Sequence, residues 1–264
     1  MKIEAVLANP AGNRTAMVLS AIQPSRRAEI AEKIMALEKH AVEQVGFLVP
    51  PLFSGAARLE MMGGEFCGNA VRSLGMYAAA RTGLTAGRVL AEISGAAAPL
   101  PVQVDRNSGT ASVLLPGGQR LDTLPWEDGT LPAVILDGIV HIIAAGMAAG
   151  QESAARILKA ARTRYDVPAL GVLFFADTMD RMQPVVWVRD TGSVIFESSC
   201  ASGSAAAAVY RCTSVSDGER EFVIRQPGGA VTARVCKAGG TVASVEIGGP
   251  VSLSQPITLD LGGT

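Results

Sequence analysis

The sequence predicts an α+β protein built from two similar lobes that face each other, and three observations support this class. The 264 residues suffice for one large domain or two small ones, at about 150 residues per domain. Apolar residues make up 48% of the chain and aromatic residues 5%, with 29 glycines, which predicts an aliphatic, sheet-rich core. The order of expected strands and helices also repeats after about 130 residues, which indicates a duplicated domain.

The first repeat opens with two strands, a helix and a third strand. Short apolar runs predict the strands, at residues 5–7, 15–19 and 46–49. The helix is predicted by Pro24-Ser25, which supplies its cap, and by apolar residues at the spacing of one helical face. These residues are Ile30, Ile34 and Leu37.

The second repeat has the same order of elements. Its strands are predicted at residues 133–136, 140–143 and 171–175, and its helix covers residues 152–164. Between the repeats, the Gly- and Pro-rich segment 116–132 is expected to be a linker.

Each repeat then carries a cysteine at the expected start of a helix. Small residues follow Cys67 (Gly68-Asn69) and Cys200 (Ala201-Ser202), and a strand follows each helix. Pseudo-symmetry would place both cysteines at the cleft between the lobes. The other two cysteines, Cys212 and Cys236, are expected to be ordinary apolar residues.

Two cysteines at two helix starts suit the inversion of a chiral α-carbon. A helix N-terminus lowers the pKa of a thiol and offers N–H groups to a carboxylate. A thiolate on one face removes the α-proton and a thiol on the other face delivers one, so Cys67 and Cys200 are the expected catalytic pair. The residues expected to hold the substrate carboxylate are Gly68, Asn69, Ala201 and Ser202.

Charge and motif content disfavour other classes. Lys+Arg number 23 and Asp+Glu 24, a net charge of −1, so neither nucleic acid nor an anionic membrane is an expected partner. No signal peptide, transmembrane segment or Cys-x-x-Cys spacing is evident, which predicts a cytoplasmic protein without a metal site. No cofactor motif is present either. The expected partner is a small-molecule amino-acid substrate, with a homodimer left open.

The cysteine segments carry a resemblance to a known family. Residues 65–72, Glu-Phe-Cys-Gly-Asn-Ala-Val-Arg, and residues 199–205, Ser-Cys-Ala-Ser-Gly-Ser-Ala, resemble the two cysteine motifs of diaminopimelate epimerases. Pro10-Ala11-Gly12-Asn13 is similar to that family's early Gly-Asn, and Gly138 to His141 stand where it has Gly-Asn-Pro-His.

The resemblance covers essentially the whole chain. It implies two pseudo-symmetric diaminopimelate epimerase-like lobes with the active site in the cleft between them, and cofactor-independent racemisation. It also implies that the last strand returns to the first lobe. The N-terminal lobe is therefore expected at residues 1–120 with 255–264, and the C-terminal lobe at residues 121–254.

Several departures from the family pattern concern the residues that bind the far end of diaminopimelate. Ile139 replaces an asparagine, Leu48-Val49 stands where the family has Asp-Gln, and the neighbourhood of Thr191 lacks a Glu-Arg pair. Ala201 also replaces a glycine. Because recognition of a polar end depends on pairing its buried groups, we expect that diaminopimelate is not the substrate.

Residues 43–47, 63–69 and 197–200 are similar to the histidine racemases of staphylopine-type metallophore pathways. This implies conversion of L-histidine to D-histidine. The further candidate substrate-binding residues are Asn13, Glu43, His141 and Glu197. For Glu65, orientation of the substrate ammonium and capping of a helix stay open, and Arg72 is expected to be structural.

Four alternatives stay open. Diaminopimelate epimerase or another racemase of this fold is one. Proline and hydroxyproline racemases share the fold and the paired cysteines but carry different residues around them. Phenazine-biosynthesis-like isomerases share the pattern Asn9-Pro10-Ala11-Gly12 but lack the two cysteines. In the last alternative, a binding protein, Cys67 and Cys200 form a disulfide or hold a metal.

Overall fold

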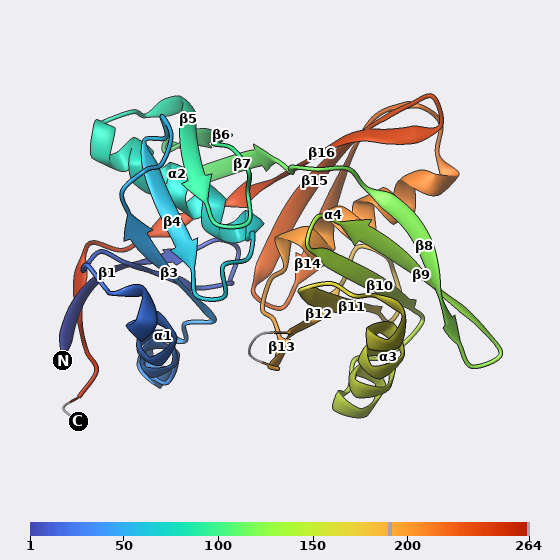
Figure 1. The fold of residues 1–264 in the computed structure, drawn as a ribbon. Coiled ribbons are helices and arrows are strands. Elements are labelled where there is room, and N and C mark those ends of the chain that lie inside the picture. Colours follow the sequence, from blue (N-terminus) through green and yellow to red (C-terminus); the bar gives the residue numbers. More distant parts are fainter. Residues whose placement is uncertain (190–191, 263–264) are drawn as a thin grey trace. The chain divides into compact units, whose positions relative to one another are not determined.

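The computed structural model of the protein describes residues 1–189 and 192–262 and has the predicted α+β class (Figure 1). Its chain divides into two compact units. Unit 1 comprises Met1–Val113 and Gly248–Thr264, and unit 2 comprises Leu114–Ile247. Thr191, part of the segment expected to lack a Glu-Arg pair, lies outside the described residues, as do residues 263–264 of the expected last strand.

Unit 1 is built on a mixed sheet. Its strands are β1 (Lys2–Asn9), β2 (Thr15–Val18), β3 (Gln44–Val49), β4 (Ala57–Met61), β5 (Ala86–Ile93), β6 (Leu100–Asp105) and β7 (Thr110–Leu114). Neighbours run in the order β7-β6-β5-β4-β3-β2-β1. Near the C-terminus, β17 (Ser252–Leu253) and β18 (Ile257–Asp260) both pair antiparallel with β1.

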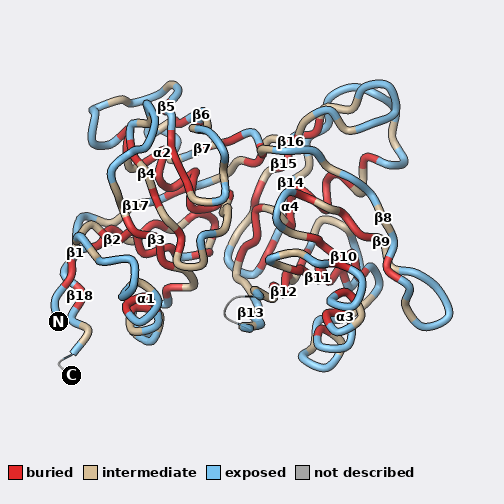
Figure 2. Tube along the Cα trace, viewed as in Figure 1, coloured by how far each residue is buried: buried red, intermediate tan, exposed pale blue. Residues whose placement is uncertain are grey.

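Two helices complete unit 1, α1 (Arg27–Met35) and α2 (Gly68–Thr82). A 3-10 turn at Pro24–Arg26 precedes α1, whose buried face packs on residues of β1, β2 and β3. Most of α2 is buried (Figure 2). Gly75 permits its close approach to the sheet, because a Cβ there would lie 2.5 Å from Cγ1 of Val102.

Unit 2 has a six-stranded sheet in the order β13-β12-β11-β10-β9-β8. These strands are β8 (Arg120–Trp126), β9 (Gly129–Leu136), β10 (Ile139–Ala145), β11 (Ala169–Phe175), β12 (Gln183–Val188) and β13 (Val194–Phe196). Strands β14 (Gly218–Gln226), β15 (Gly229–Ala238) and β16 (Thr241–Pro250) are also neighbours in this order.

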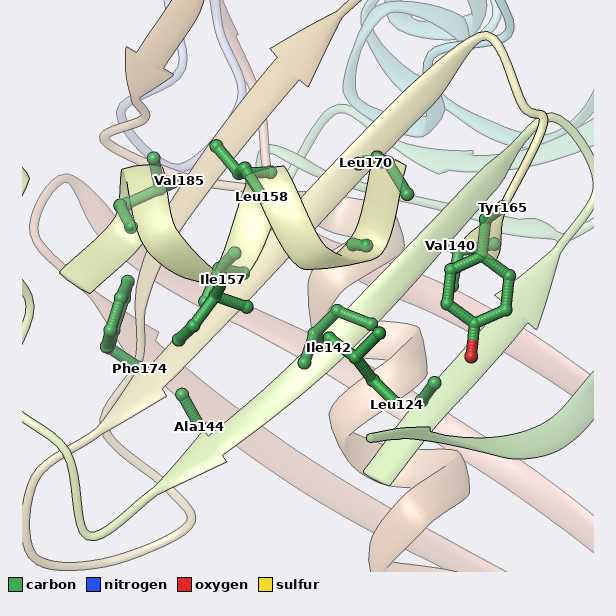
Figure 3. Packing of buried hydrophobic residues seen from close by; sticks show 14 residues of the cluster. Leu124, Val140, Ile142, Ala144, Ile157, Leu158, Tyr165, Leu170, Phe174 and Val185 are labelled. Carbon is green, nitrogen blue, oxygen red and sulfur yellow. The ribbon is translucent and has the colours of Figure 1, made fainter. Parts of the chain in front are cut away.

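The helices of unit 2 are α3 (Gln151–Arg164) and α4 (Ala201–Arg211). Ile157 and Leu158 of α3 belong to one apolar cluster with Ile142 of β10 and Phe174 of β11 (Figure 3). No helix within residues 1–189 and 192–262 combines the length and apolar character needed to cross a membrane.

The predicted duplication appears in the strand pairing. Strands β1 and β2 pair antiparallel, as do β9 and β10. The next strand in each unit is parallel, β3 beside β2 and β11 beside β10, and the one after that is antiparallel, β4 beside β3 and β12 beside β11. A helix connects each parallel pair, α1 in unit 1 and α3 in unit 2. The two units therefore repeat the same order and direction of paired strands.

The expected linker at residues 116–132 is wrong. The segment contains β8 and the start of β9, which pair antiparallel from Arg120↔Ile135 to Trp126↔Gly129. Leu124 is the one buried residue of β8. An edge strand with so few buried residues lacks the alternation from which strands are recognised.

Candidate active site

Cys67 and Cys200 occupy the same place in their helices. Each is the N-cap residue with an extended backbone, at φ −130° and ψ 113° for Cys67 and at φ −122° and ψ 112° for Cys200. The Cys67 sulfur accepts from the N–H of Ala70 at 3.4 Å, and the Cys200 sulfur from that of Gly203 at 3.4 Å. Both sulfurs therefore lie at the positive end of a helix dipole, where the thiolate is favoured.

In unit 1 a chain of side chains leads to Cys67. Its thiol donates to Oε1 of Gln44 at 3.2 Å. Nε2 of Gln44 donates to Oγ1 of Thr15 at 2.8 Å and also to Oδ1 of Asn13, and Nδ2 of Asn13 donates to Oε2 of Glu43 at 3.0 Å. A carboxylate only accepts hydrogen bonds, so Asn13 directs its NH2 group to Glu43 and its carbonyl oxygen to Gln44. Gln44 in turn directs its NH2 group to Asn13 and its carbonyl oxygen to the Cys67 thiol.

The strand register brings this chain together. Gln44 is the first residue of β3 and pairs with Thr15, the first residue of β2. The turn before β2 contains Ala11 at φ 57° and Gly12 at φ 100°, and the N–H of Gly12 donates to Oδ1 of Asn9 at 2.7 Å. The Gly-Asn turn predicted to bind substrate thus buries Asn13, which is 2% exposed.

A buried cation belongs to the first helix. Arg72 is fully buried and donates to Oδ1 of Asn69 at 2.7 Å and to the carbonyl of Ala111 at 3.4 Å. Burial lowers the pKa of Arg72 to about 10, and the negative charge of Cys67 opposes that lowering. At neutral pH the guanidinium is therefore charged, and its field favours the thiolate of Cys67.

In unit 2 the turn at Cys200 is fixed by two polar side chains. The backbone N–H of Cys200 donates to Oε1 of Gln226 at 2.6 Å. Nε2 of Gln226 donates to Oγ of Ser204 at 3.0 Å, and that hydroxyl donates to the carbonyl of Cys200 at 2.8 Å. Gln226 ends β14, so this strand positions the start of α4.

Cys200 has different surroundings from Cys67. Burial raises the pKa of the Cys200 thiol well above its ordinary value, and the charge of Glu197 raises it further. Hydrogen bonds from Ser202 and Gly203 act in the opposite direction. Oγ of Ser202 lies 3.4 Å from the Cys200 sulfur and 2.9 Å from Nε2 of His141. Cys200 is therefore a protonated thiol at neutral pH.

The comparison with known families decides the identity. The family described as "Histidine racemase CntK N-terminal domain" matches residues 2–256. The chain belongs to this histidine racemase family. A histidine racemase of Fusobacterium nucleatum subsp. nucleatum is 32% identical over 213 residues, which are 76% of this chain and 78% of that protein. The protein is accordingly an isomerase of the racemase and epimerase type.

Solved structures share the fold. A PhzF-family phenazine biosynthesis protein of Bacillus anthracis matches with a TM-score of 0.69 at 17% identity, covering 98% of this chain and 99% of that one. A hydroxyproline epimerase of Agrobacterium vitis matches with a TM-score of 0.65 at 13% identity, covering 98% and 92%. These likenesses confirm the epimerase-type α+β fold.

The residues predicted for this racemase fall into one group in each unit. Unit 1 holds Cys67, Gly68, Asn69, Asn13 and Glu43, and unit 2 holds Cys200, Ala201, Ser202, His141 and Glu197. Gly68 and Ala201 are the first residues of α2 and α4. Because Ala201 is helical, alanine fits at this position, where the resemblance led us to expect glycine.

Sequence reasoning missed three residues of these groups. Gln44 accepts from the Cys67 thiol and donates to Thr15, and Gln226 accepts from the backbone N–H of Cys200. Gln44 lies next to the predicted site residue Glu43, but no signal pointed to Gln226. In the described part of the chain, no group of three or more His, Cys, Asp and Glu side chains is arranged to hold a metal ion.

Proposed function

We propose that the protein interconverts L- and D-histidine without a cofactor, with Cys67 and Cys200 as base and acid on opposite faces of the substrate α-carbon. The observation that carries the proposal is the N-cap position shared by the two cysteines, one in each unit. Membership of the histidine racemase family supports histidine as the substrate. A metallophore-building enzyme is the proposed consumer of D-histidine.

The proposed reaction has two proton transfers. A thiolate takes the α-proton as the Cα–H bond breaks, and the electron pair moves onto the carboxylate. The N–H groups of Gly68, Asn69, Ala201 and Ser202, in the first turns of the two helices, stabilise that negative charge. The opposite thiol then gives its proton to the α-carbon. The two cysteines end with exchanged protonation states, and no atom or electron is left over.

The resting protonation follows from the two environments. Arg72 favours the thiolate of Cys67, while burial and Glu197 favour the thiol of Cys200. The neutral hydrogen bond from Cys67 to Gln44 acts against the thiolate by about 1 kcal/mol. We therefore propose Cys67 as the base in the resting enzyme and Cys200 as the acid.

The side chains proposed to bind the ammonium and imidazole groups of histidine are acidic. Glu43, which accepts from Asn13, and Glu197, beside Cys200, are the proposed partners of the ammonium and imidazole groups of histidine. A cationic substrate end and a carboxylate form a charge-assisted hydrogen bond. No other partner is needed for the reaction, and a homodimer stays open.

Proton exchange tests the proposal. Incubation in D₂O with L-histidine is expected to remove the α-proton NMR signal and to produce D-histidine. Cys67→Ser and Cys200→Ser are each expected to lower racemisation by at least about 100-fold, because each removes one acid–base group. Cys236→Ser, in β15, serves as the matched control and keeps its activity.

Other results would contradict parts of the proposal. Exchange with another amino acid from a panel that includes L,L-diaminopimelate, but not with L-histidine, would overturn the substrate. Racemisation that survives both serine substitutions would overturn the two-cysteine mechanism.

A further inference from the structure

His141 is an unusual histidine. It is fully buried in β10 and pairs with Gly171 of β11. A Cβ at Gly171 would lie 2.1 Å from Nδ1 of His141, so the glycine lets the ring lie directly against the neighbouring backbone. Among the described residues, Nδ1 has no hydrogen-bond partner. The polar contact of the ring is the one from Nε2 to Oγ of Ser202, at 2.9 Å.

This arrangement selects the tautomer of the ring. Burial lowers the pKa of His141 to about 3, so the imidazole is neutral and carries one N–H. A proton on Nδ1 would be an orphaned buried donor against Gly171, and orphaned donors are rarer than orphaned acceptors. A proton on Nε2 instead donates to Ser202. The Nε2–H tautomer is therefore favoured, and Oγ of Ser202 acts as acceptor toward His141.

The hydroxyl proton of Ser202 is then available to the second cysteine. Oγ of Ser202 lies 3.4 Å from Sγ of Cys200, and the N–H of Gly203 reaches the same sulfur at 3.4 Å. We infer that His141 is a positioning residue that holds Ser202 as a hydrogen-bond donor to Cys200. In this assignment the His141 ring and the Ser202 hydroxyl serve the thiol, and the backbone N–H of Ser202 stays available to the substrate carboxylate.

We call the hydrogen bonds from His141 to Ser202 and from Ser202 to Cys200 the relay. Its role in catalysis rests on the proposed function. Cys200 must give its proton to the substrate, yet burial and the negative charge of Glu197 both hold that proton on sulfur. Two donors, Ser202 and Gly203, stabilise the thiolate that remains after the transfer. No acidic side chain lies in the first turn of α4 to oppose them. Because His141 does not titrate near neutrality, His141 stays the donor to Ser202, and Ser202 the donor to Cys200, as pH changes around neutrality.

The tautomer can be measured in the unmodified protein. His40 and His141 are the two histidines of the chain, so two-bond ¹H–¹⁵N NMR spectra of ¹⁵N-labelled protein contain two ring systems. The expected result is an Nε2–H tautomer for His141 that persists over about pH 5 to 9. An Nδ1–H tautomer, or titration of this ring within that range, would overturn the relay.

Alkylation of Cys200 measures its effect on the thiol. Iodoacetamide rates against pH, resolved by peptide mass spectrometry, report each cysteine separately. Ser202→Ala and His141→Leu are each expected to slow alkylation of Cys200 about tenfold at a fixed pH, because one hydrogen bond to a charged sulfur is lost. His141→Gln keeps an N–H close to the position of Nε2 and is expected to stay within about threefold of the original protein. Alkylation of Cys67, in unit 1, is the internal control.

The double variant His141→Leu/Ser202→Ala is expected to be no slower than Ser202→Ala alone, since the two residues act in series. An unchanged rate in His141→Leu would overturn the relay, and so would equal losses in His141→Leu and His141→Gln. These readouts need no turnover. A normal Cys200 response in a protein that does not racemise histidine would support the relay and refute the proposed function.

Discussion

At the scale of single residues, we expect Arg72 to distinguish the first thiol from the second. The fully buried guanidinium of Arg72, which donates to an amide oxygen and to a backbone carbonyl, belongs to the residue five positions after the N-cap Cys67. A nearby cation lowers the pKa of a thiol, so its removal should raise that pKa. Arg72→Met is therefore expected to slow alkylation of Cys67 at pH 7 by about tenfold. Cys200 should be unaffected.

The control for this prediction keeps the charge. Arg72→Lys should leave the alkylation of Cys67 closer to that of the original protein, although it loses the forked geometry of the guanidinium. Circular dichroism and thermal unfolding would establish that each variant is folded. Unchanged alkylation of Cys67 in a folded Arg72→Met protein would remove Arg72 from the account of the resting thiolate.

The same scale shows which candidate site residues a sequence can indicate. Cys67 and Cys200 were predicted because each precedes a run of small residues at an equivalent place in a repeat. Gln44 contacts Cys67 across 23 residues and Gln226 contacts Cys200 across 26, through side chains that end or begin strands. Such contacts depend on register, which leaves no local pattern in a single sequence.

At the scale of elements, Glu92 of β5 fixes the connection between β3 and β4. Its side chain is 2% exposed, and its carboxylate accepts from the backbone N–H groups of Leu52 at 2.7 Å, Phe53 at 3.0 Å and Gly55 at 2.9 Å. Glu92→Gln is expected to lower the free energy of unfolding by about 2 kcal/mol at pH 7, because N–H groups lose a charged acceptor. Chemical denaturation measures this loss.

The effect should depend on pH. Burial alone would raise the pKa of Glu92, but the three N–H groups and Arg58 outweigh it, so the pKa in the folded state is lowered. The stabilisation is therefore present above the unfolded pKa of about 4.3 and lost as pH falls through the folded value. The difference in stability between the original protein and the Glu92→Gln variant should shrink in acid. A matched control is Glu127→Gln, an exposed partner of Arg156, for which we expect a change below about 1 kcal/mol.

Elements with a buried face were predictable, whereas the edge strands β8 and β13 were not. Helix α3 and strand β11 bury a regular set of apolar residues, so their pattern was visible in the sequence. Strand β8 buries one residue, and β13 is three residues long with none buried. These strands are held by backbone hydrogen bonds to β9 and β12. Backbone pairing does not require a regular alternation of apolar side chains, so the sequence carries no pattern that reveals such strands.

At the scale of the whole molecule, the chain leaves unit 1 after Val113 and returns to it at Gly248. Unit 2 is thus one continuous insertion with its own apolar core. Each unit carries one cysteine in the same N-cap geometry, but with different surroundings, a buried cation in unit 1 and a neutral histidine relay proposed in unit 2. The two units thus share the N-cap geometry of the cysteine and differ in the charged and polar groups around it.

The proposed reaction needs both thiols at one α-carbon, and one chain carries both. A Cys67→Ser protein co-refolded with a Cys200→Ser protein is therefore expected to stay as inactive as either variant alone in the α-proton exchange assay. Alkylation of the remaining thiol in each variant controls for folding. Recovery of activity in the mixture would mean that a functional pair can be assembled from two chains, as in an intertwined homodimer, and would refute a site completed within one polypeptide.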